Sequence, residues 1–356
     1  MIRESVIPSL LKNTTQSYKC LWALALLNLA KENPNTNSMS IADITAYSTI
    51  YALELINTYK IRLSANRDSV FEKISNINFQ DTKHKDRLDK YHKLFTVDER
   101  LRLENKFKEY VLYRFQSPFI QISGTDHEKH KNLKACIDIS GSESRYDTDL
   151  IYKYDCDRRE LLINKEWLVY LRDNYVLLNS FFTYEFSNYL HKYNISIPSL
   201  LHKVDPTTIQ TREQLTSKRK VWDNYISESI VTDIFDNERL HSISGSHLDH
   251  FIPWSYVSHN LLWNLTPINQ IINIKKSDKI ICNEMYFEKF ATQQYELYSW
   301  LHDNNQNKNI EEYRLVSLDG LSRKDFITAH SQIISDNANT AIRQGFTKIT
   351  NLNELR

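Results

Sequence analysis

The stretch that decides the fold lies between His247 and Lys279 and reads HLDHFIPWSYVSHNLLWNLTPINQIINIKKSDK. Asp249 and His250 are adjacent in it, and Pro253 follows them closely. A carboxylate can hold a hard cation, and an imidazole can take a proton from water near neutral pH. Such a pair at the end of a strand is typical of a metal-assisted hydrolase.

The second half of this stretch predicts a helix. Thr266 followed by Pro267 suits a helix start, with threonine as the N-cap and proline at the first helical position. At about 3.6 residues per turn, Asn273 and Lys276 then share one face. We therefore expect a strand that ends in the Asp-His pair, a loop, and a helix presenting amide oxygens and an ammonium. With residues 231–240 as the other strand, the arrangement would be ββα.

This block resembles the HNH nuclease superfamily, in which a ββα-metal finger cleaves a phosphodiester with one divalent ion. It looks closest to the HNH domain of RNA-guided CRISPR effector nucleases, where D-H-x-x-P-x-S is followed by N and then by N-x-x-K-S-D. It also looks like stand-alone bacterial HNH proteins with a DHFIPW core. The residues that carry the match are Asp249, His250, Pro253, Ser255, Asn264, Asn273, Lys276, Ser277 and Asp278. The third signature position, often His, is Asn273, and the zinc-knuckle cysteines of many HNH folds are missing.

The resemblance implies roles for several of the matched residues. Asp249 and Asn273 would hold the metal. Asn269 is a rival ligand because it shares the predicted helix face with Asn273. His250 would be the general base, and Asn264 would complete the catalytic set by fixing the loop around it. Because the ligands are oxygen atoms, one Mg²⁺ or Mn²⁺ ion per site is expected rather than Zn²⁺. Cleavage would leave 5′-phosphate and 3′-hydroxyl ends.

Contacts with nucleic acid must be local, because 45 Lys and Arg against 44 Asp and Glu leave a net charge of only +1. The candidates are Lys276, His247 and the basic triplet Lys218, Arg219 and Lys220. The triplet could equally be a solvated surface, and His247 and His259 could be ordinary surface residues. His127 and His130 have metal-like spacing, but their polar surroundings favour an exposed loop.

The chain as a whole is expected to be α+β and predominantly helical, with the HNH finger set between helical regions. Only 5 glycines and 7 prolines in 356 residues favour long helices. We predict a helical region at 1–109, a mixed strand and helix region at 110–205, the HNH nuclease domain at 206–285 and a helical region at 286–356. Within the mixed region we expect strands at 110–122, 135–139, 150–154 and 160–163, one helix at 165–193 and a linker at 200–209.

The cysteines and the apolar runs predict the cellular location of the protein. Four cysteines lie far apart without a CxxC pair, which argues against a disulfide framework and a structural zinc site. The apolar run at 20–30 is about half the roughly 20 residues that a membrane span needs, so it favours a buried helix. We therefore expect a cytoplasmic protein without a membrane partner.

Three functional classes fit these patterns. The first is a DNA endonuclease of the HNH type, by family analogy in bacterial restriction or anti-phage defence. It could act as the effector of a larger system, with a sensor subunit, an ATPase or a guide complex as partner. The second, a PD-(D/E)xK nuclease using Glu104 and Lys106, is discarded because those residues lie in a charged helical stretch. The third is a non-catalytic or RNA-directed binding module that retains the HNH fold.

Overall fold

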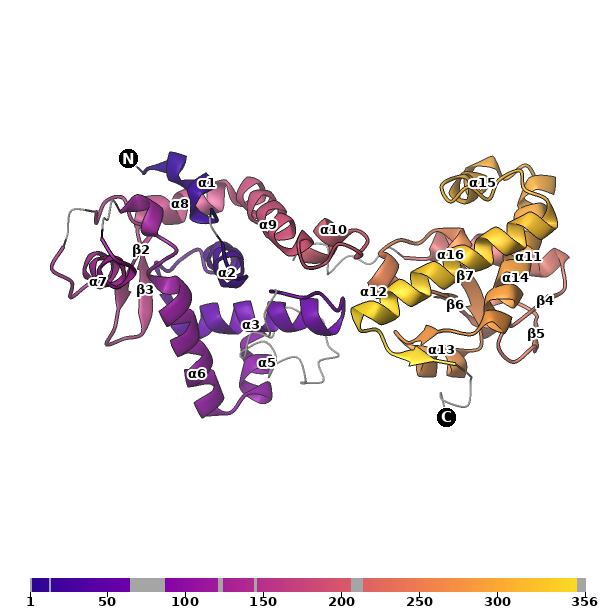
Figure 1. The fold of residues 1–356 in the computed structure, drawn as a ribbon, viewed down its shortest axis with the longest axis horizontal. Coiled ribbons are helices and arrows are strands. Elements are labelled where there is room, and N and C mark those ends of the chain that lie inside the picture. The colour runs from indigo at the N-terminus through magenta and orange to yellow at the C-terminus, as the bar shows by residue number, and fades with distance from the viewer. Residues whose placement is uncertain are drawn as a thin grey trace. The chain divides into compact units, whose positions relative to one another are not determined.

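A computed structural model describes residues 2–12, 14–64, 87–120, 124–143, 146–205 and 214–350 (Figure 1). The chain divides into two compact units. The first comprises Met1–Ile195 and Leu200–Gln210, and the second comprises Ser196–Ser199 and Thr211–Arg356. The prediction of an α+β, predominantly helical fold is confirmed. No helix among the described residues is long and apolar enough to cross a membrane.

The first unit is built on two buried helices, α2 (Tyr18–Glu32) and α3 (Ile41–Asn57), which pack on each other. Apolar side chains of α2 are buried nearly all round the helix, as expected for a central helix. The side chain of Ser40 caps α3 by accepting the amide hydrogen of Asp43. The remaining helical segments of the unit are η1 (Glu4–Val6), α1 (Ile7–Leu10), α5 (Arg87–Leu94), α6 (Val97–Phe107), η3 (Lys108–Leu112), η4 (Ser117–Phe119), α7 (Asp126–Ile137), α8 (Lys165–Asp173), α9 (Tyr175–His191) and α10 (Leu200–Val204).

A small antiparallel sheet completes this unit in the order β1 (Ser38–Ser40), β3 (Glu160–Ile163), β2 (Tyr152–Asp155). The predicted hairpin of residues 150–154 and 160–163 is confirmed as β2 and β3, with Tyr154 opposite Leu161. Strand β1 was not predicted from the sequence. It pairs with β3 across a separation of more than a hundred residues, which local patterns do not reveal.

Several local predictions for this unit are wrong. In the described part of residues 110–122 the chain is helical, as η3 and η4, because Val111, Phe115 and Phe119 recur every fourth residue and form one buried face. Residues 121–122 lie outside the described residues. Residues 135–137 belong to α7, which starts at a capping box of Thr125 and Glu128. This helix, rather than a loop, carries His127 and His130.

Two boundaries near the end of this unit also differ. The helix predicted at 165–193 is interrupted at Asn174, whose side-chain amide donates to the carbonyl of Tyr170 at 3.0 Å. A short polar side chain that bonds the preceding turn competes with helix continuation. In the predicted linker, residues 200–204 form α10. Residues 206–209 lie outside the described residues.

The second unit joins the HNH region and the C-terminal helices around one core. Its elements are α11 (Thr216–Glu228), β4 (Val231–Thr232), β5 (Arg239–Leu240), η5 (Ile243–Gly245), β6 (His247–His250), α12 (Trp254–Val257), η6 (Leu262–Asn264), β7 (Leu265–Ile268), α13 (Gln270–Lys276), β8 (Ile280–Ile281), α14 (Glu284–Asp303), α15 (Asn307–Arg314), α16 (Arg323–Gln344) and β9 (Lys348–Ile349). In Figure 1 the long helices α14 and α16 lie beside each other, as their contacts also show.

The predicted boundary at 285/286 therefore does not separate two compact bodies. Phe251, which follows β6, stacks on Phe290 of α14 with ring centroids 4.4 Å apart. Buried residues from Trp222 to Ile349 form one hydrophobic cluster. The small β6–β7 hairpin cannot bury its own apolar face, so α14 and α16 cover it. Neighbouring helices thus hold the finger, which lacks the zinc-knuckle cysteines of many HNH folds.

Candidate active site

The matched stretch folds as two antiparallel strands followed by a helix. Asp249 of β6 lies opposite Thr266 of β7, and His250 lies opposite Leu265. The second strand is thus β7, whereas residues 231–240 form a separate hairpin of β4 and β5. The ββα arrangement is present, but the predicted identity of its second strand is wrong.

The predicted helix start at Thr266 and Pro267 is also wrong, because both residues lie in β7. A proline is tolerated there because β7 pairs on one side only, in a two-stranded sheet. The helix α13 begins later, at Gln270, with Asn269 as its N-cap. The Asn269 side chain accepts the amide hydrogen of Ile271 at 2.8 Å, so it caps the helix and is not placed as a metal ligand.

His250 ends β6 and is almost fully buried, at 1% exposure. Its Nε2 lies 3.1 Å from the carbonyl oxygen of His259 and 3.0 Å from Oδ1 of Asn260. A carbonyl oxygen only accepts hydrogen bonds, so Nε2 carries the hydrogen and Nδ1 holds the lone pair of the neutral ring. The loop after β6 thereby selects the tautomer in which Nδ1 can take up a proton.

Asn264, the last residue of η6, closes that loop just before β7 begins. Its Nδ2 donates to the carbonyl of Ile252 at 2.8 Å, and its Oδ1 accepts the Ile252 amide hydrogen at 2.9 Å. Its own carbonyl accepts the amide hydrogen of Phe251 at 2.8 Å. The side chain is fully buried. These contacts are those of a positioning residue that holds the backbone next to His250, in line with the role that the resemblance implies.

Lys276 is buried, whereas a contact with a DNA phosphate needs an exposed ammonium group. It is 1% exposed, and its Nζ donates to Asp249 Oδ2 and to the His250 carbonyl, both at 2.8 Å. The prediction that Lys276 meets the DNA backbone is therefore contradicted. A partly buried carboxylate and a buried carbonyl need polar partners, and the lysine at the end of α13 supplies both. The ammonium orients the carboxylate of Asp249.

Asn273 and Asp249, the two predicted metal ligands, belong to elements that pack face to face. His247 and Asp249 lie two residues apart in β6 and so point to the same side. The side-chain nitrogen of Asn273 lies 3.0 Å from Nδ1 of His247, and Lys276 of the same helix contacts Asp249. Helix α13 therefore covers the side of β6 that carries Asp249. His247, a predicted nucleic-acid contact, is half-buried beside Asn273.

The donor set at this place suits a hard divalent cation. Asp249 Oδ2 is engaged by Lys276, while Oδ1 makes no hydrogen bond among the described residues. The amide of Asn273 offers an oxygen once its side chain is turned, since the two amide atoms are assigned from the surrounding contacts. No cluster of three or more His, Cys, Asp or Glu in the described ranges could hold a metal. A metal here would rest on Asp249, Asn273 and water molecules, as Mg²⁺ commonly does.

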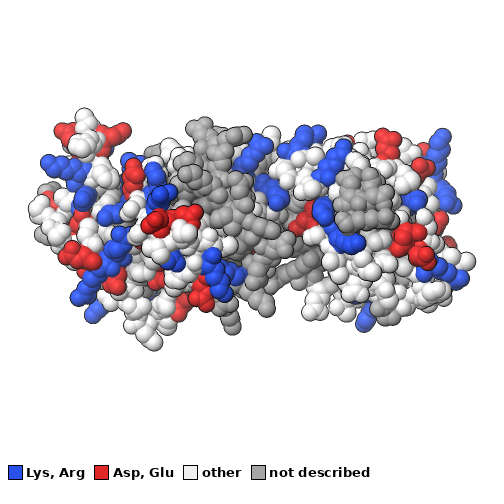
Figure 2. Space-filling model, turned by 90° about the horizontal axis from the view of Figure 1, so that it is seen from below, with Lys and Arg blue, Asp and Glu red and all other residues white. Residues whose placement is uncertain are grey.

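The basic triplet of α11 is only partly available to nucleic acid. Lys218 makes an ion pair with Glu312 of α15 and is 15% exposed. The other carboxylate oxygen of Glu312 accepts the amide hydrogen of Leu262 at 2.7 Å. The pair thus ties two helices to the loop before β7, and Lys218 is not an exposed DNA contact. Arg219, which is half-buried, and the exposed Lys220 remain predicted contacts. In each unit, the face seen in Figure 2 mixes positive and negative side chains.

Two residues that matter here were missed from the sequence. The first is the fully buried Asp233, whose Oδ2 accepts the amide hydrogen of Asn269 at 2.6 Å and whose Oδ1 accepts that of Phe235 at 2.7 Å. Burial raises the pKa of Asp233 to about 6. The side chain holds the start of α13 in place. An acidic residue inside the apolar segment 230–235 was the signal that could have revealed it.

The second missed residue is His330 of α16, which is fully buried. Its Nε2 lies 2.8 Å from the carbonyl oxygen of Trp263, next to Asn264. Burial lowers the pKa of His330 to about 4, although the hydrogen bond to Trp263 opposes the shift. The helix that closes the core thus also fixes the loop that carries Asn264.

This lowered pKa predicts acid sensitivity of the second unit. Between pH 6.5 and about 4 the unfolded chain protonates this histidine while the folded chain does not, so stability is lost as the pH falls. The contribution to the free energy of unfolding should drop by about 2 kcal/mol by pH 5. Urea unfolding of wild type and His330→Gln at pH 7.5 and 5 measures it, and the stability gap should shrink at pH 5. The exposed His241→Gln is the control, and a gap independent of pH would contradict the assignment.

Comparison with known protein families agrees with this geometry. The family model described as HNH endonuclease matches residues 233–281. No curated protein and no solved structure matches the chain. The matched range begins at the buried Asp233 and contains both strands of the β6–β7 hairpin, helix α13 and the residues from Asp249 to Asn273. The second unit of this chain therefore contains an HNH endonuclease domain, and this domain indicates nuclease-type activity on nucleic acid.

Proposed function

We propose that this protein is a metal-dependent endonuclease that hydrolyses phosphodiester bonds of DNA. One observation carries the proposal. Asp249 and His250 are the last two residues of strand β6, and helix α13, which carries Asn273, covers this strand. All three residues lie within the range that matches HNH endonucleases. A carboxylate, an amide and an imidazole with its Nδ1 lone pair are the groups that such a hydrolysis needs in one place.

Each group of the chain has a defined task in this proposal. His250 Nδ1 takes the proton of the attacking water, while the bonds of Nε2 to His259 and Asn260 keep the ring oriented. Asp249 and Asn273 would hold one Mg²⁺ or Mn²⁺ ion. When bound, that ion would stabilise the charge on the scissile phosphate and the leaving 3′ oxygen. Lys276 orients the Asp249 carboxylate, as outer-shell partners of metal ligands do.

The rival candidate is a non-catalytic or RNA-directed binding module with the same fold. The presence of Asp249, His250 and Asn273 together favours the enzyme. A non-catalytic binding module would need neither a general base nor metal ligands. A role in bacterial restriction or anti-phage defence, with a sensor, ATPase or guide-complex partner, is proposed from family analogy alone. A cytoplasmic location is proposed from the isolated cysteines.

Incubation of the full chain with supercoiled plasmid, linear duplex DNA and RNA of the same sequence, in Mg²⁺ or Mn²⁺, tests the proposal. We expect nicked or linear DNA whose ends DNA ligase can rejoin, since they carry 5′-phosphate and 3′-hydroxyl groups, and intact RNA. Cleavage of RNA alone would support the RNA-directed alternative. Binding of DNA without cleavage in both metals would support the non-catalytic module.

A further inference from the structure

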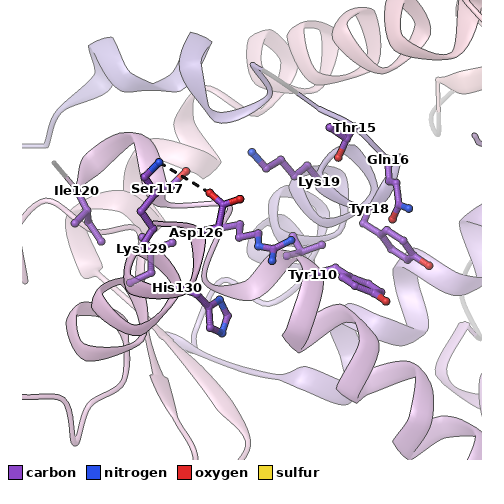
Figure 3. Close-up of a pocket in the computed structure, with 13 residues that line it drawn as sticks. Thr15, Gln16, Tyr18, Lys19, Tyr110, Ser117, Ile120, Asp126, Lys129 and His130 are labelled. Atoms are coloured by element: carbon purple, nitrogen blue, oxygen red, sulfur yellow. Dashed lines mark ion pairs between the residues drawn. The ribbon is translucent and has the colours of Figure 1, made fainter. Parts of the chain in front are cut away.

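The first unit contains a cavity of about 430 Å³ that the nuclease domain does not use. It lies between the start of α2, the segment around η3 and η4, and helix α7. Figure 3 shows Asp126, Lys129 and His130 of α7 on one side and Tyr18 and Tyr110 on the other, with the Lys19 side chain reaching between them. The full lining is Thr15, Gln16, Tyr18, Lys19, Tyr110, Val111, Arg114, Ser117, Ile120, Asp126, Lys129, His130 and Leu133.

Basic groups dominate the charge of this cavity. Lys19, Arg114 and Lys129 line it together with His130, against one carboxylate, Asp126. Lys129 lies 4.0 Å from Asp126, an exposed pair of neighbouring helix turns. Within the ranges that the structure describes, no acidic side chain pairs with Lys19 or Arg114. Two cations that form no ion pair with a described residue therefore line the same cavity.

The titration of the neighbouring groups reflects this crowding. Burial lowers the pKa of Lys19; Cys20 opposes this shift, and the charge of Arg114 adds to it. The pKa of His130 is lowered first by burial and then by Arg114. In addition, Nδ1 of His130 is buried and has no hydrogen-bond partner among the described residues. An anion in the cavity would relieve the repulsion between Lys19 and Arg114.

The rest of the lining indicates the size and character of the ligand. Val111, Ile120 and Leu133 are buried apolar residues, and Tyr110 adds a half-buried ring. Ligand pockets for small organic molecules measure about 300–1,000 Å³, so this cavity offers more room than a free phosphate ion requires. Asp126, fully exposed at the edge, disfavours a long polyanion running across the opening.

We propose that this cavity binds a small organic phosphate. Lys19 and Arg114 hold the phosphoryl group, and the carbon part lies against the apolar wall of η3 and α7. Charge-assisted hydrogen bonds from an ammonium and a guanidinium are the strong contacts of phosphate sites. The first unit is thus a ligand-binding module in the same chain as the HNH unit, and this inference does not depend on the nuclease activity proposed above.

Isothermal titration calorimetry of the full chain tests the proposal with AMP, ribose 5-phosphate and inorganic phosphate as probes. We expect AMP or ribose 5-phosphate to bind once per chain and more tightly than inorganic phosphate. Arg114→Gln and Lys19→Gln should each weaken binding about tenfold or more, since each removes a charge-assisted bond. Arg114 is exposed, so its variant should keep the fold. Lys134→Gln, an exposed α7 residue outside the lining, is the matched control.

Four outcomes would overturn the proposal. The first is no binding of either organic phosphate at millimolar concentration. The second is binding that Arg114→Gln leaves unchanged, and the third is binding of inorganic phosphate as tight as that of the organic probes. The fourth is Arg114-dependent binding of a single-stranded oligonucleotide without binding of the small probes, which would make the cavity part of a nucleic-acid surface. His250→Ala should bind the probes like wild type, so a loss of cleavage and a loss of ligand binding are distinguishable.

Discussion

Replacing His250 with alanine is expected to lower the rate of DNA cleavage about 10²–10⁴-fold while DNA binding persists. The rate falls because the variant lacks the proposed general base, the imidazole that directly follows Asp249 at the end of β6. Single-turnover cleavage of plasmid DNA measures the rate, and a gel-shift assay measures binding. Because the side chain is buried, alanine leaves a cavity and removes the Nε2 donor to the His259 carbonyl. His250→Gln keeps a donor for that carbonyl and should be equally slow.

The controls separate the general base from its neighbours. His241→Ala, an exposed histidine of the same unit, should cut like wild type. His247→Ala removes the contact with Asn273 and should slow cleavage less than His250→Ala. If His250→Ala and His250→Gln cut normally while His247→Ala is inactive, the base is His247. The assignment of Asn273 as a metal ligand would then fall as well.

Replacing Asp249 with asparagine is expected to weaken Mg²⁺ binding more than about 100-fold. Loss of an outer-shell partner of a metal ligand typically weakens metal binding about 10–100-fold, and Asp249 is a proposed ligand itself. The carboxylate supplies the only negative charge in the proposed ligand set. Asparagine keeps an acceptor for the buried Lys276, whereas alanine would strand its ammonium and endanger the fold. Titration of Mn²⁺ followed by electron paramagnetic resonance measures binding independently of cleavage.

Removal of the metal from the wild-type protein also tests whether cleavage depends on a divalent ion. EDTA should abolish cleavage, and excess Mg²⁺ or Mn²⁺ should restore it. In Asp249→Asn, cleavage should return only at much higher Mn²⁺ than wild type needs. Asp278→Asn, an exposed residue just after α13, is the control and should keep the wild-type metal dependence. Full activity of the wild type in EDTA, or unchanged Mn²⁺ affinity in Asp249→Asn, would contradict the single-metal proposal.

Much of the candidate site could be predicted because its residues lie close together in the sequence. Asp249, His250, Asn264 and Asn273 fall within 25 residues, and the hairpin and short helix that carry them are local structures. Residue types at fixed spacing therefore predicted which groups lie together at the candidate site. The hairpin of β2 and β3 and the buried helix α2 were predictable for the same reason. Periodicity and adjacent pairing are properties of short segments.

What only the tertiary structure decided are the contacts between distant segments. Thr266 and Pro267 carry the local signals of a helix start, but pairing with β6 draws them into a strand. Lys276 is buried because Asp249 lies above α13, and Lys218 is engaged because α15 brings Glu312 beside it. The sequence by itself determined which groups can do the chemistry. The fold decided which of them are exposed, because burial depends on segments that no local pattern relates.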